Sequence, residues 1–212
     1  MNITLHVPTI DQVHPDPIKN TTAEPWLWEV LAEGLMHDPG FRFFFGDKFS
    51  ETKMVRFMEA AVRGALESGG AVFSSCDRKV VLVWRWYGQE MPAEYIQEIF
   101  HLLGTEGTKR YLWFREATDV PIEPAYRTST MRPQYIGVLP DSQGRGYGSH
   151  ILKWTLDYFD QQGFKIPFLV ASTRRSAKLY GPLLGFDADK EVYLGLDGEA
   201  PAVVVMKRKS DR

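Results

Sequence analysis

The chain has 212 residues, 44% of them hydrophobic and 25% charged, a composition typical of one globular domain and unlike that of disordered or fibrous proteins. Its formal net charge of −2 and the absence of a long basic block give no electrostatic reason to expect nucleic acid or a membrane as a partner. One cysteine excludes an intrachain disulfide, and we find no secretory signal and no apolar run of ~18 residues, so we expect a cytoplasmic protein.

Metal and thiol chemistry have little support. The five histidines are scattered, and none lies three to five residues from another histidine or from the cysteine, so we expect no metal site. Cys76 lies between a strand-like run and a turn and is best interpreted as a structural thiol.

The first half of the chain predicts helices followed by a β-hairpin. Residues 1–20 are expected to form an arm or strand that leads into the domain. A helix capped by Thr22 is stopped by the sequence HDPG, and a second helix with apolar residues from Met54 to Leu66 on one face ends at Gly69. AVFSS and KVVLVWRWYG are typical of two hairpin strands, and MPAEYIQEIFHLLG is typical of a helix.

Residues 105–132 show no clear period. They hold the aromatic residues Tyr111, Trp113, Phe114 and Tyr126 among the carboxylates Glu116, Asp119 and Glu123. The segment is either a cover that faces a ligand or a packed amphipathic piece. We favour the packed piece, because aromatic clusters more often fill a core than contact a ligand.

The second half of the chain has clearer signals. QYIGVLP predicts a strand, SHILKWTLDYFDQQG a helix, IPFLVAS a strand, RRSAKLYGPLLGF a helix, and EVYLGL with PAVVVMKR a closing pair of strands. The first three elements form a βαβ-like unit. We find no repeat and no long linker, so residues 1–212 are predicted to form a single domain.

The loop QGRGYGS begins the helix of this unit and has a glycine at every second position, 144, 146 and 148. The first N–H groups of a helix lack partners and glycine lets the backbone approach closely, so this loop is suited to bind phosphate, helped by Arg145 and Ser149. The spacing differs from the dinucleotide fingerprint, and no lysine follows as in the nucleotide-hydrolase loop. Pyrophosphate is the natural candidate.

The string IGVLPDSQGRGYGSHIL resembles the acyl-CoA-binding motif of the GNAT acyltransferase superfamily, with Gln143, Gly146 and Gly148 at its fixed positions. TRRSAKLYGPLLGF resembles the second motif of the same family. It departs from that motif at Thr173, where asparagine is usual, at Ser176, where alanine is usual, and at the inserted Pro182. DPGFRFFFGD, the helix after it and VVLVWRWYG loosely resemble the puromycin N-acetyltransferase-like branch.

The resemblance implies an α/β (α+β) fold with a central mixed, mostly antiparallel sheet flanked by helices, and an acyl-CoA-binding core at residues 134–186. It also implies acetyl-CoA as cosubstrate, with the pantetheine arm between the two strands of the core. The predicted cofactor-binding residues are Ile136, Gly137, Val138, Gln143, Gly144, Arg145, Gly146, Tyr147, Gly148, Ser149, Thr173 and Ser176.

Tyr180 is the candidate general acid, because a neutral phenol can donate a proton to a departing thiolate. Glu116 and Glu123 are the candidate general bases, with Asp119, His150 and a water chain as alternatives.

We therefore expect an acetyl-CoA-dependent N-acetyltransferase that acts on a primary amine of a small molecule or peptide and exists as a monomer or homodimer. A longer acyl group or an alcohol acceptor would keep the same chemistry. The main alternative is a CoA-binding regulatory or degenerate domain without transferase activity, which the departures at Thr173 and Pro182 would favour.

Overall fold

The computed structural model describes residues 14–195 and 201–209. The predicted N-terminal arm therefore lies outside the described residues except for its last part. The strands are β1 (Ile18–Asn20), β2 (Ala71–Ser74), β3 (Val80–Trp86), β4 (Met131–Val138), β5 (Phe168–Ala171), β6 (Phe186–Tyr193) and β7 (Ala202–Arg208). The helices are α1 (Pro25–Gly34), α2 (Pro39–Phe45), α3 (Glu51–Glu67), α4 (Ala93–Thr118), α5 (Tyr147–Gln161) and α6 (Arg174–Leu184), with 3-10 turns η1 (Gly46–Lys48), η2 (Pro124–Ser129) and η3 (Pro140–Ser142).

The strands form two antiparallel sheets that meet at one point. One sheet has the order β1-β2-β3-β4 and the other has the order β5-β7-β6. A parallel bridge joins Thr130 to Lys165, where the Met131 N–H donates to the Lys165 carbonyl (2.9 Å) and the Lys165 N–H donates to the Ser129 carbonyl (2.7 Å). β4 and β5 follow this bridge without pairing with each other in the described chain, so they diverge and leave a slot between them.

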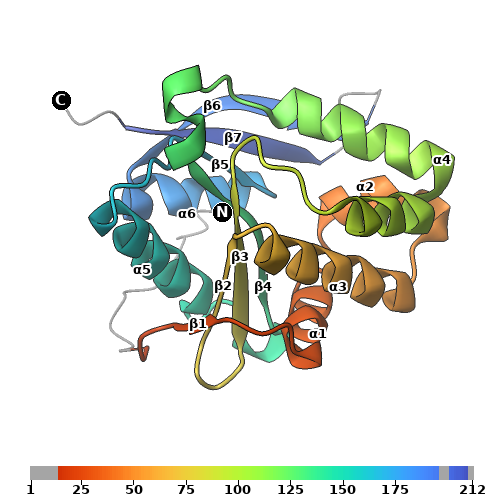
Figure 1. The fold of residues 1–212 in the computed structure, drawn as a ribbon, viewed down its shortest axis with the longest axis horizontal. Helices are drawn as coiled ribbons and strands as arrows, with labels where there is room; N and C mark the ends of the chain where they lie inside the picture. The colour runs from red at the N-terminus through yellow and green to blue at the C-terminus, as the bar shows by residue number, and fades with distance from the viewer. Residues whose placement is uncertain (1–13, 196–200, 210–212) are drawn as a thin grey trace, which may run out of the picture.

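Helices cover both faces of the first sheet, as Figure 1 shows, with α5 on one side and α1 and α3 on the other. Successive side chains along a strand point to opposite faces of the sheet, so alternate residues pack against the helices on each face. Val72, Val81 and Val83 pack with the helices before them, whereas Phe73 and Leu82 pack with α5 and the second sheet. The predicted α/β architecture, with antiparallel sheets flanked by helices, is confirmed.

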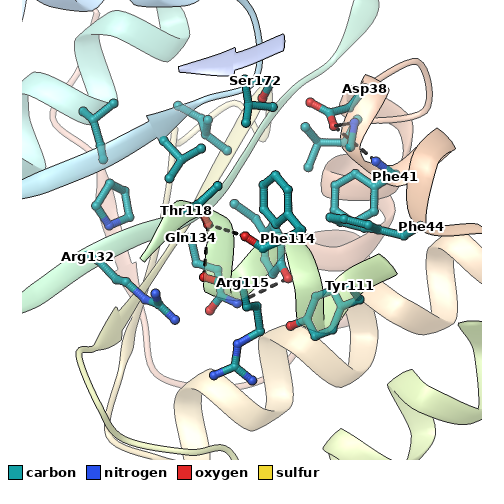
Figure 2. A pocket seen from close by; sticks show the side chains of 18 of the residues that line it. Asp38, Phe41, Phe44, Tyr111, Phe114, Arg115, Thr118, Arg132, Gln134 and Ser172 are labelled. Atoms are coloured by element: carbon teal, nitrogen blue, oxygen red, sulfur yellow. Dashed lines mark hydrogen bonds between the residues drawn. The ribbon is translucent and has the colours of Figure 1, made fainter. Parts of the chain in front are cut away.

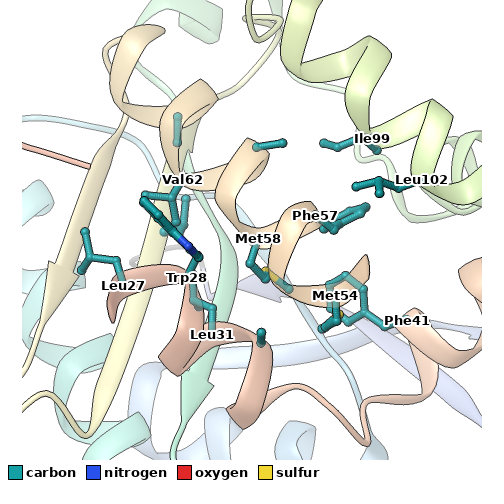
Figure 3. Close-up of a cluster of buried hydrophobic side chains, with 14 of the residues drawn as sticks. Leu27, Trp28, Leu31, Phe41, Met54, Phe57, Met58, Val62, Ile99 and Leu102 are labelled. Atoms are coloured by element: carbon teal, nitrogen blue, oxygen red, sulfur yellow. The ribbon is translucent and has the colours of Figure 1, made fainter. Parts of the chain in front are cut away.

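The core under α1 and α3 is rich in aromatic side chains and methionine (Figure 3). Leu31, Met54, Phe57 and Met58 are completely buried there. Burying such a side chain contributes about 1.5–3 kcal/mol each, so this cluster holds the N-terminal helices firmly against the sheet.

Helix α1 makes an unusually close contact with β4. A Cβ atom added to Gly34 would lie 2.6 Å from the Val138 nitrogen, and one added to Gly137 would lie 2.8 Å from the Leu31 Cα atom. Both distances are shorter than any real Cβ contact, so the two glycines permit a backbone-to-backbone approach. The end of β4 is thereby fixed against the helix.

The predicted helix over residues 91–104 is only the first part of α4. Gly104, at φ 68°, interrupts the helical geometry, and the chain then continues as a helix to Thr118. Tyr111 is buried and Phe114 half-buried in this second part, while Trp113 and Tyr126 are exposed. The packed interpretation therefore holds for the inner aromatic residues of this segment and fails for the outer ones.

Candidate active site

Two cavities open from the slot between β4 and β5. The first, here called the α4-side cavity, is lined by Asp38, Phe41 and Phe44 from α2 and its cap, by Tyr111, Phe114 and Arg115 from α4, and by residues of both strands. The second, here called the α6-side cavity, is lined by Tyr180 and Leu152 and by the same strands. Pro133, Gln134, Tyr135, Ile136, Leu169, Val170 and Ser172 line both cavities. The slot thus connects two binding spaces on opposite sides of the sheet.

The backbone of β4 has hydrogen-bonding groups directed toward the slot. The Leu139 N–H donates to the Lys79 carbonyl (2.9 Å), and β3 pairs with Val81 opposite Gly137. Because N–H groups alternate in direction along an antiparallel strand, those of Ile136 and Val138 face away from β3, toward the slot. The backbone N–H and carbonyl groups of Gly137 face β3 instead. Of the three residues predicted to contact the cofactor through their backbone, we therefore retain Ile136 and Val138. Gly137 packs against α1.

The glycine loop lies at the start of α5, as predicted. Gly144 and Gly146 have φ values of 77° and 87°, and Gly146 is the N-cap of the helix. The first hydrogen bond of the helix runs from the His150 N–H to the Gly146 carbonyl (2.9 Å), which leaves the N–H groups of residues 147–149 without a helical partner. These donors, on a helix N-terminus, suit an anionic group such as pyrophosphate.

The side chains of the loop have different partners. Gln143 donates its side-chain N–H to the Val138 carbonyl (3.1 Å) and so ties the loop to β4. Tyr147 donates its hydroxyl to Asp77 in the β2–β3 turn (2.6 Å), while the Arg145 side chain is exposed. Gly148 packs close to Val138, with 3.4 Å between an added Cβ and the nearest methyl group. Gln143 and Tyr147 therefore hold the loop in shape, and Arg145 is free to face a ligand.

Tyr180 projects from α6 into the α6-side cavity. Thr173 caps this helix by accepting a hydrogen bond from the Ser176 N–H (3.0 Å), and α6 continues through Pro182 to Leu184. The departures from the family motif thus leave the helix intact around the tyrosine. Burial, followed by the negative charge of Asp38, raises the pKa of Tyr180 to about 12, so its phenol stays protonated at neutral pH.

Asp38 is the carboxylate that the structure brings to the slot. Its Oδ1 accepts hydrogen bonds from the N–H groups of Gly40 (2.8 Å) and Phe41 (3.4 Å), so it is the N-cap of α2 (Figure 2). Burial raises the pKa of Asp38 above its usual 3.8, opposed by hydrogen bonds from the Ser172 hydroxyl and these two N–H groups. Its charge also acts on Tyr180, which places an acid and a base within electrostatic reach of each other across the slot.

The predicted bases lie elsewhere. Glu116 and Asp119 are exposed and line a neighbouring cavity with Tyr87, which donates its hydroxyl to Asp119 (3.2 Å). Glu123 is exposed at the start of η2, and His150 lies on α5 outside the linings of both cavities. Neither Glu116 nor Glu123 lines the slot, whereas Asp38 does, so Asp38 is the carboxylate best placed to act there as a base. The sequence DPG signals a helix cap followed by proline, and nothing in that local signal indicates chemistry.

No group of three or more His, Cys, Asp or Glu side chains in residues 14–195 and 201–209 could hold a metal ion. Among the helices in that part of the chain, none is long and apolar enough to span a bilayer.

Residues 83–186 match the family model described as acetyltransferase (GNAT) family. No curated protein sequence matches the chain. Among solved structures, histone acetyltransferase HPA2 and related acetyltransferase from Corynebacterium glutamicum ATCC 13032 is similar over 94% of this chain and 98% of its own, with a TM-score of 0.64 and 17% identity.

Arylalkylamine N-acetyltransferase 2 from Aedes aegypti is similar over 91% of this chain and 98% of its own, with a TM-score of 0.60 and 13% identity. A Bacillus subtilis acetyltransferase in complex with CoA is similar over 92% of this chain and 98% of its own, with a TM-score of 0.50 and 12% identity. At these identities the similarity establishes the fold.

Proposed function

Because residues 83–186 belong to the acetyltransferase (GNAT) family, we propose that this protein is an acetyl-CoA-dependent N-acetyltransferase that acetylates a primary amine by direct attack on the thioester. The observation that carries the proposal is the slot, with a protonated phenol, Tyr180, on one side and a half-buried carboxylate, Asp38, on the other. Acyl transfer to an amine needs an acid for the leaving thiolate and a base for the amine.

The α6 side of the slot has the features that acyl-CoA needs. The free N–H groups at the start of α5 suit the pyrophosphate, and the slot-facing N–H groups of Ile136 and Val138 suit the pantetheine arm and the thioester oxygen. An oxyanion donor contributes about 3 kcal/mol to lowering the barrier, so one backbone N–H here has a large effect. The Bacillus subtilis acetyltransferase of similar fold is in complex with CoA, which supports the assignment.

The α4 side of the slot has the features that an amine acceptor needs. Asp38 removes a proton from the ammonium, directly or through the hydroxyl of Ser172, which lines the same cavity. The raised pKa makes its carboxylate a stronger base than a solvent-exposed aspartate. The amine nitrogen then attacks the thioester carbon, forming the C–N bond as the C–S bond breaks.

Tyr180 completes the reaction on the other side. A thiol has a pKa of about 8.5 and an unperturbed phenol about 10, so the phenol stays neutral and donates a hydrogen bond to the thiolate as charge develops on sulfur. The second proton, which the attacking nitrogen loses as the amide forms, passes to the sulfur, so that Tyr180 ends the reaction protonated. The products are an N-acetylated amine and CoA. Because Tyr180 stays protonated to about pH 12, it is in the donor form whenever Asp38 is ionised at neutral pH.

The alternative, a CoA-binding domain without transferase activity, has weaker support. It rested on Thr173 and Pro182, and both are accommodated in a continuous α6 that presents Tyr180 to the slot. A longer acyl group, a relation to the puromycin N-acetyltransferase-like branch, a cytoplasmic location and the oligomeric state stay predictions. Two proteins of similar fold, a histone acetyltransferase and an arylalkylamine N-acetyltransferase, suggest peptide amines and arylalkylamines as first acceptors to test.

The test has two stages. Thermal unfolding with acetyl-CoA, free CoA and NAD should show a raised midpoint for the first two alone, because a ligand that binds only the folded state stabilises it. Thiol release from acetyl-CoA is then measured with a panel of amines. Binding of CoA without release for any acceptor would support the non-catalytic domain and refute the transferase.

A further inference from the structure

Two arginines line the α4-side cavity, and a third lies beside them. Arg115 comes from α4 and Arg132 from β4, and Arg85 of β3 is buried nearby with 4% of its surface exposed. Figure 2 shows Asp38 and Ser172 at one end of this cavity and Arg115 and Arg132 at the other, with Phe114 between them in the view. The cavity therefore has a negative end, which also faces the slot, and a positive end.

The positive end has unused hydrogen-bonding capacity. Arg115 pairs with Glu90 (3.1 Å), and Arg85 donates to the Gln89 carbonyl (2.7 Å). Arg132 has no ion pair and no hydrogen-bond acceptor among the described residues, and its Nε atom is buried. A buried unpartnered donor on a charged group is costly, so its presence calls for an acceptor from outside the protein.

The arginines also repel one another. The pKa of Arg85 is lowered by burial and next by the charge of Arg132, which shows that the two cations are close. Carboxylates near the cluster do not pair with Arg132. Glu90 pairs with Arg115. Glu116 and Asp119 line a neighbouring cavity together with Arg132, but among the described residues neither forms an ion pair with an arginine.

We propose that the amine acceptor carries a carboxylate as well as its amine, and that Arg132, with Arg115 beside it, binds this carboxylate. The inference rests on the proposed function and specifies its substrate class, an amino acid or a related amino-carboxylate. The planar guanidinium of Arg132 matches a carboxylate in geometry and charge. The amine lies toward Asp38, and the aromatic side chains of Phe41, Phe44 and Phe114 contact the part of the acceptor between its two charged ends. A diamine would bring a second cation to the arginines and be disfavoured.

The test compares acceptors that differ only in the carboxylate. Phenylalanine is paired with phenethylamine, and ε-aminocaproate with pentylamine, so that both α- and ω-amino acids are covered. The wild-type kcat/KM should favour the carboxylated member of at least one pair by on the order of 10- to 100-fold, the range for a charge-assisted hydrogen bond. The pair with the larger ratio shows which spacing the cavity accepts.

Three variants connect that preference to Arg132. Arg132→Gln should reduce the ratio toward one, mainly by raising the KM of the carboxylated acceptor, and Arg132→Lys should retain part of it. Arg56→Gln is the matched control, since Arg56 pairs with Glu98 on the surface, and it should leave the ratio unchanged. Equal unfolding midpoints would show that Arg132→Gln is folded. A wild-type ratio near one in both pairs, or a ratio that Arg132→Gln does not change, would overturn the proposal.

A binding measurement separates this proposal from the transferase activity. Calorimetric titration of N-acetylphenylalanine and N-acetylphenethylamine, each with CoA present, needs no turnover. Tighter binding of the carboxylate, lost in Arg132→Gln, would support the anion site even if no acceptor were acetylated, in which case only the transferase would be refuted. Equal binding of the two would refute the anion site even if both parent amines were substrates.

Discussion

The two sides of the slot are built in different ways. The α6 side comes from two short stretches of sequence: residues 136–149 form the end of β4, the glycine loop and the start of α5, and residues 173–186 contain α6. The α4 side combines Asp38, Arg115, Arg132 and Ser172 from four separate parts of the chain. A binding surface of the first kind leaves a motif in the sequence, whereas one of the second kind exists only in the folded protein.

This difference makes a kinetic prediction. Substitutions on the α6 side should change the parameters of acetyl-CoA or the departure of the thiolate, and those on the α4 side should change the parameters of the acceptor. The four substitutions that follow test this separation.

Tyr180→Phe should have the largest effect. Loss of the phenolic hydrogen removes the acid from the α6 side, and kcat should fall roughly 100- to 10,000-fold, the usual contribution of general acid–base catalysis. The affinity for CoA, measured by calorimetry, should change little because the ring remains. A kcat within a few-fold of wild type would remove Tyr180 from the mechanism.

Asp38→Asn should lower kcat/KM for the acceptor about 100-fold and flatten its pH dependence. In the wild type, activity should rise with pH as Asp38 ionises, and the rise should lie above pH 3.8 because burial raises its pKa. The control Glu116→Gln/Glu123→Gln should keep full activity, since both residues lie outside the slot. A large loss in the control with none in Asp38→Asn would restore the exposed carboxylates as bases.

The same substitution should leave stability intact. Asn also caps a helix well, so the bonds to Gly40 and Phe41 are retained. A carboxyl whose folded-state pKa is raised contributes stability below its unfolded pKa, and this contribution is lost as pH rises through the folded value. The unfolding midpoint of Asp38→Asn at neutral pH should therefore equal or exceed that of the wild type.

Gly146→Ala should raise the KM for acetyl-CoA on the order of 10-fold, which corresponds to about 1.4 kcal/mol. The residue has φ 87° at the N-cap of α5, where a Cβ is strained and the free N–H groups would be displaced. Gly163→Ala is the matched control, because Gly163 has φ 80° near the other end of the same helix, in open space. Both variants should lose similar stability, and only Gly146→Ala should change the KM.

Thr173→Ala should have the smallest effect on the reaction. Loss of the cap of α6 should reduce the free energy of unfolding by about 1 kcal/mol, with only a small change in kcat. Thr173→Asn, which introduces the residue usual in the family motif, should restore the stability. Chemical denaturation of the three proteins measures this. A CoA affinity that falls more than stability would show that Thr173 contacts the cofactor.

The sequence predicted the elements whose formation depends on residues close together in the chain. The hairpin, the β4–loop–α5 unit and α6 with Tyr180 were located because glycine, apolar period and β-branched runs act over a few residues. The helix α4 was predicted only to Gly104. The φ of 68° at this glycine interrupts the helical geometry, and the chain then resumes a helix as far as Thr118.

The features of the site that the sequence did not predict depend on residues that are far apart in the chain. Asp38 has a complete local explanation as a helix cap, so its position beside Ser172 and Tyr180 has no sequence signal. Glu116 and Glu123 were chosen because they lie in the segment expected to cover the substrate, and the side of α4 that carries Glu116 faces solvent. For Gly137, the motif identified the residue but not the direction of its backbone groups, which depends on the pairing of β4 with β3.

The close contact of α1 with β4 at Gly34 and Gly137 limits which substitutions this protein can accept. The backbone of α1 lies directly against the backbone of β4, the strand that carries the slot-facing N–H groups. An added Cβ atom would meet backbone atoms there, so a change of side-chain rotamer cannot relieve the clash. A methyl group at either position would displace β4 and inactivate the protein without altering any residue that lines a cavity. The acceptor-facing residues of α2 and α4 have no such restraint on their side chains. Acceptor preference can therefore diversify by point substitution while the reacting geometry stays constant.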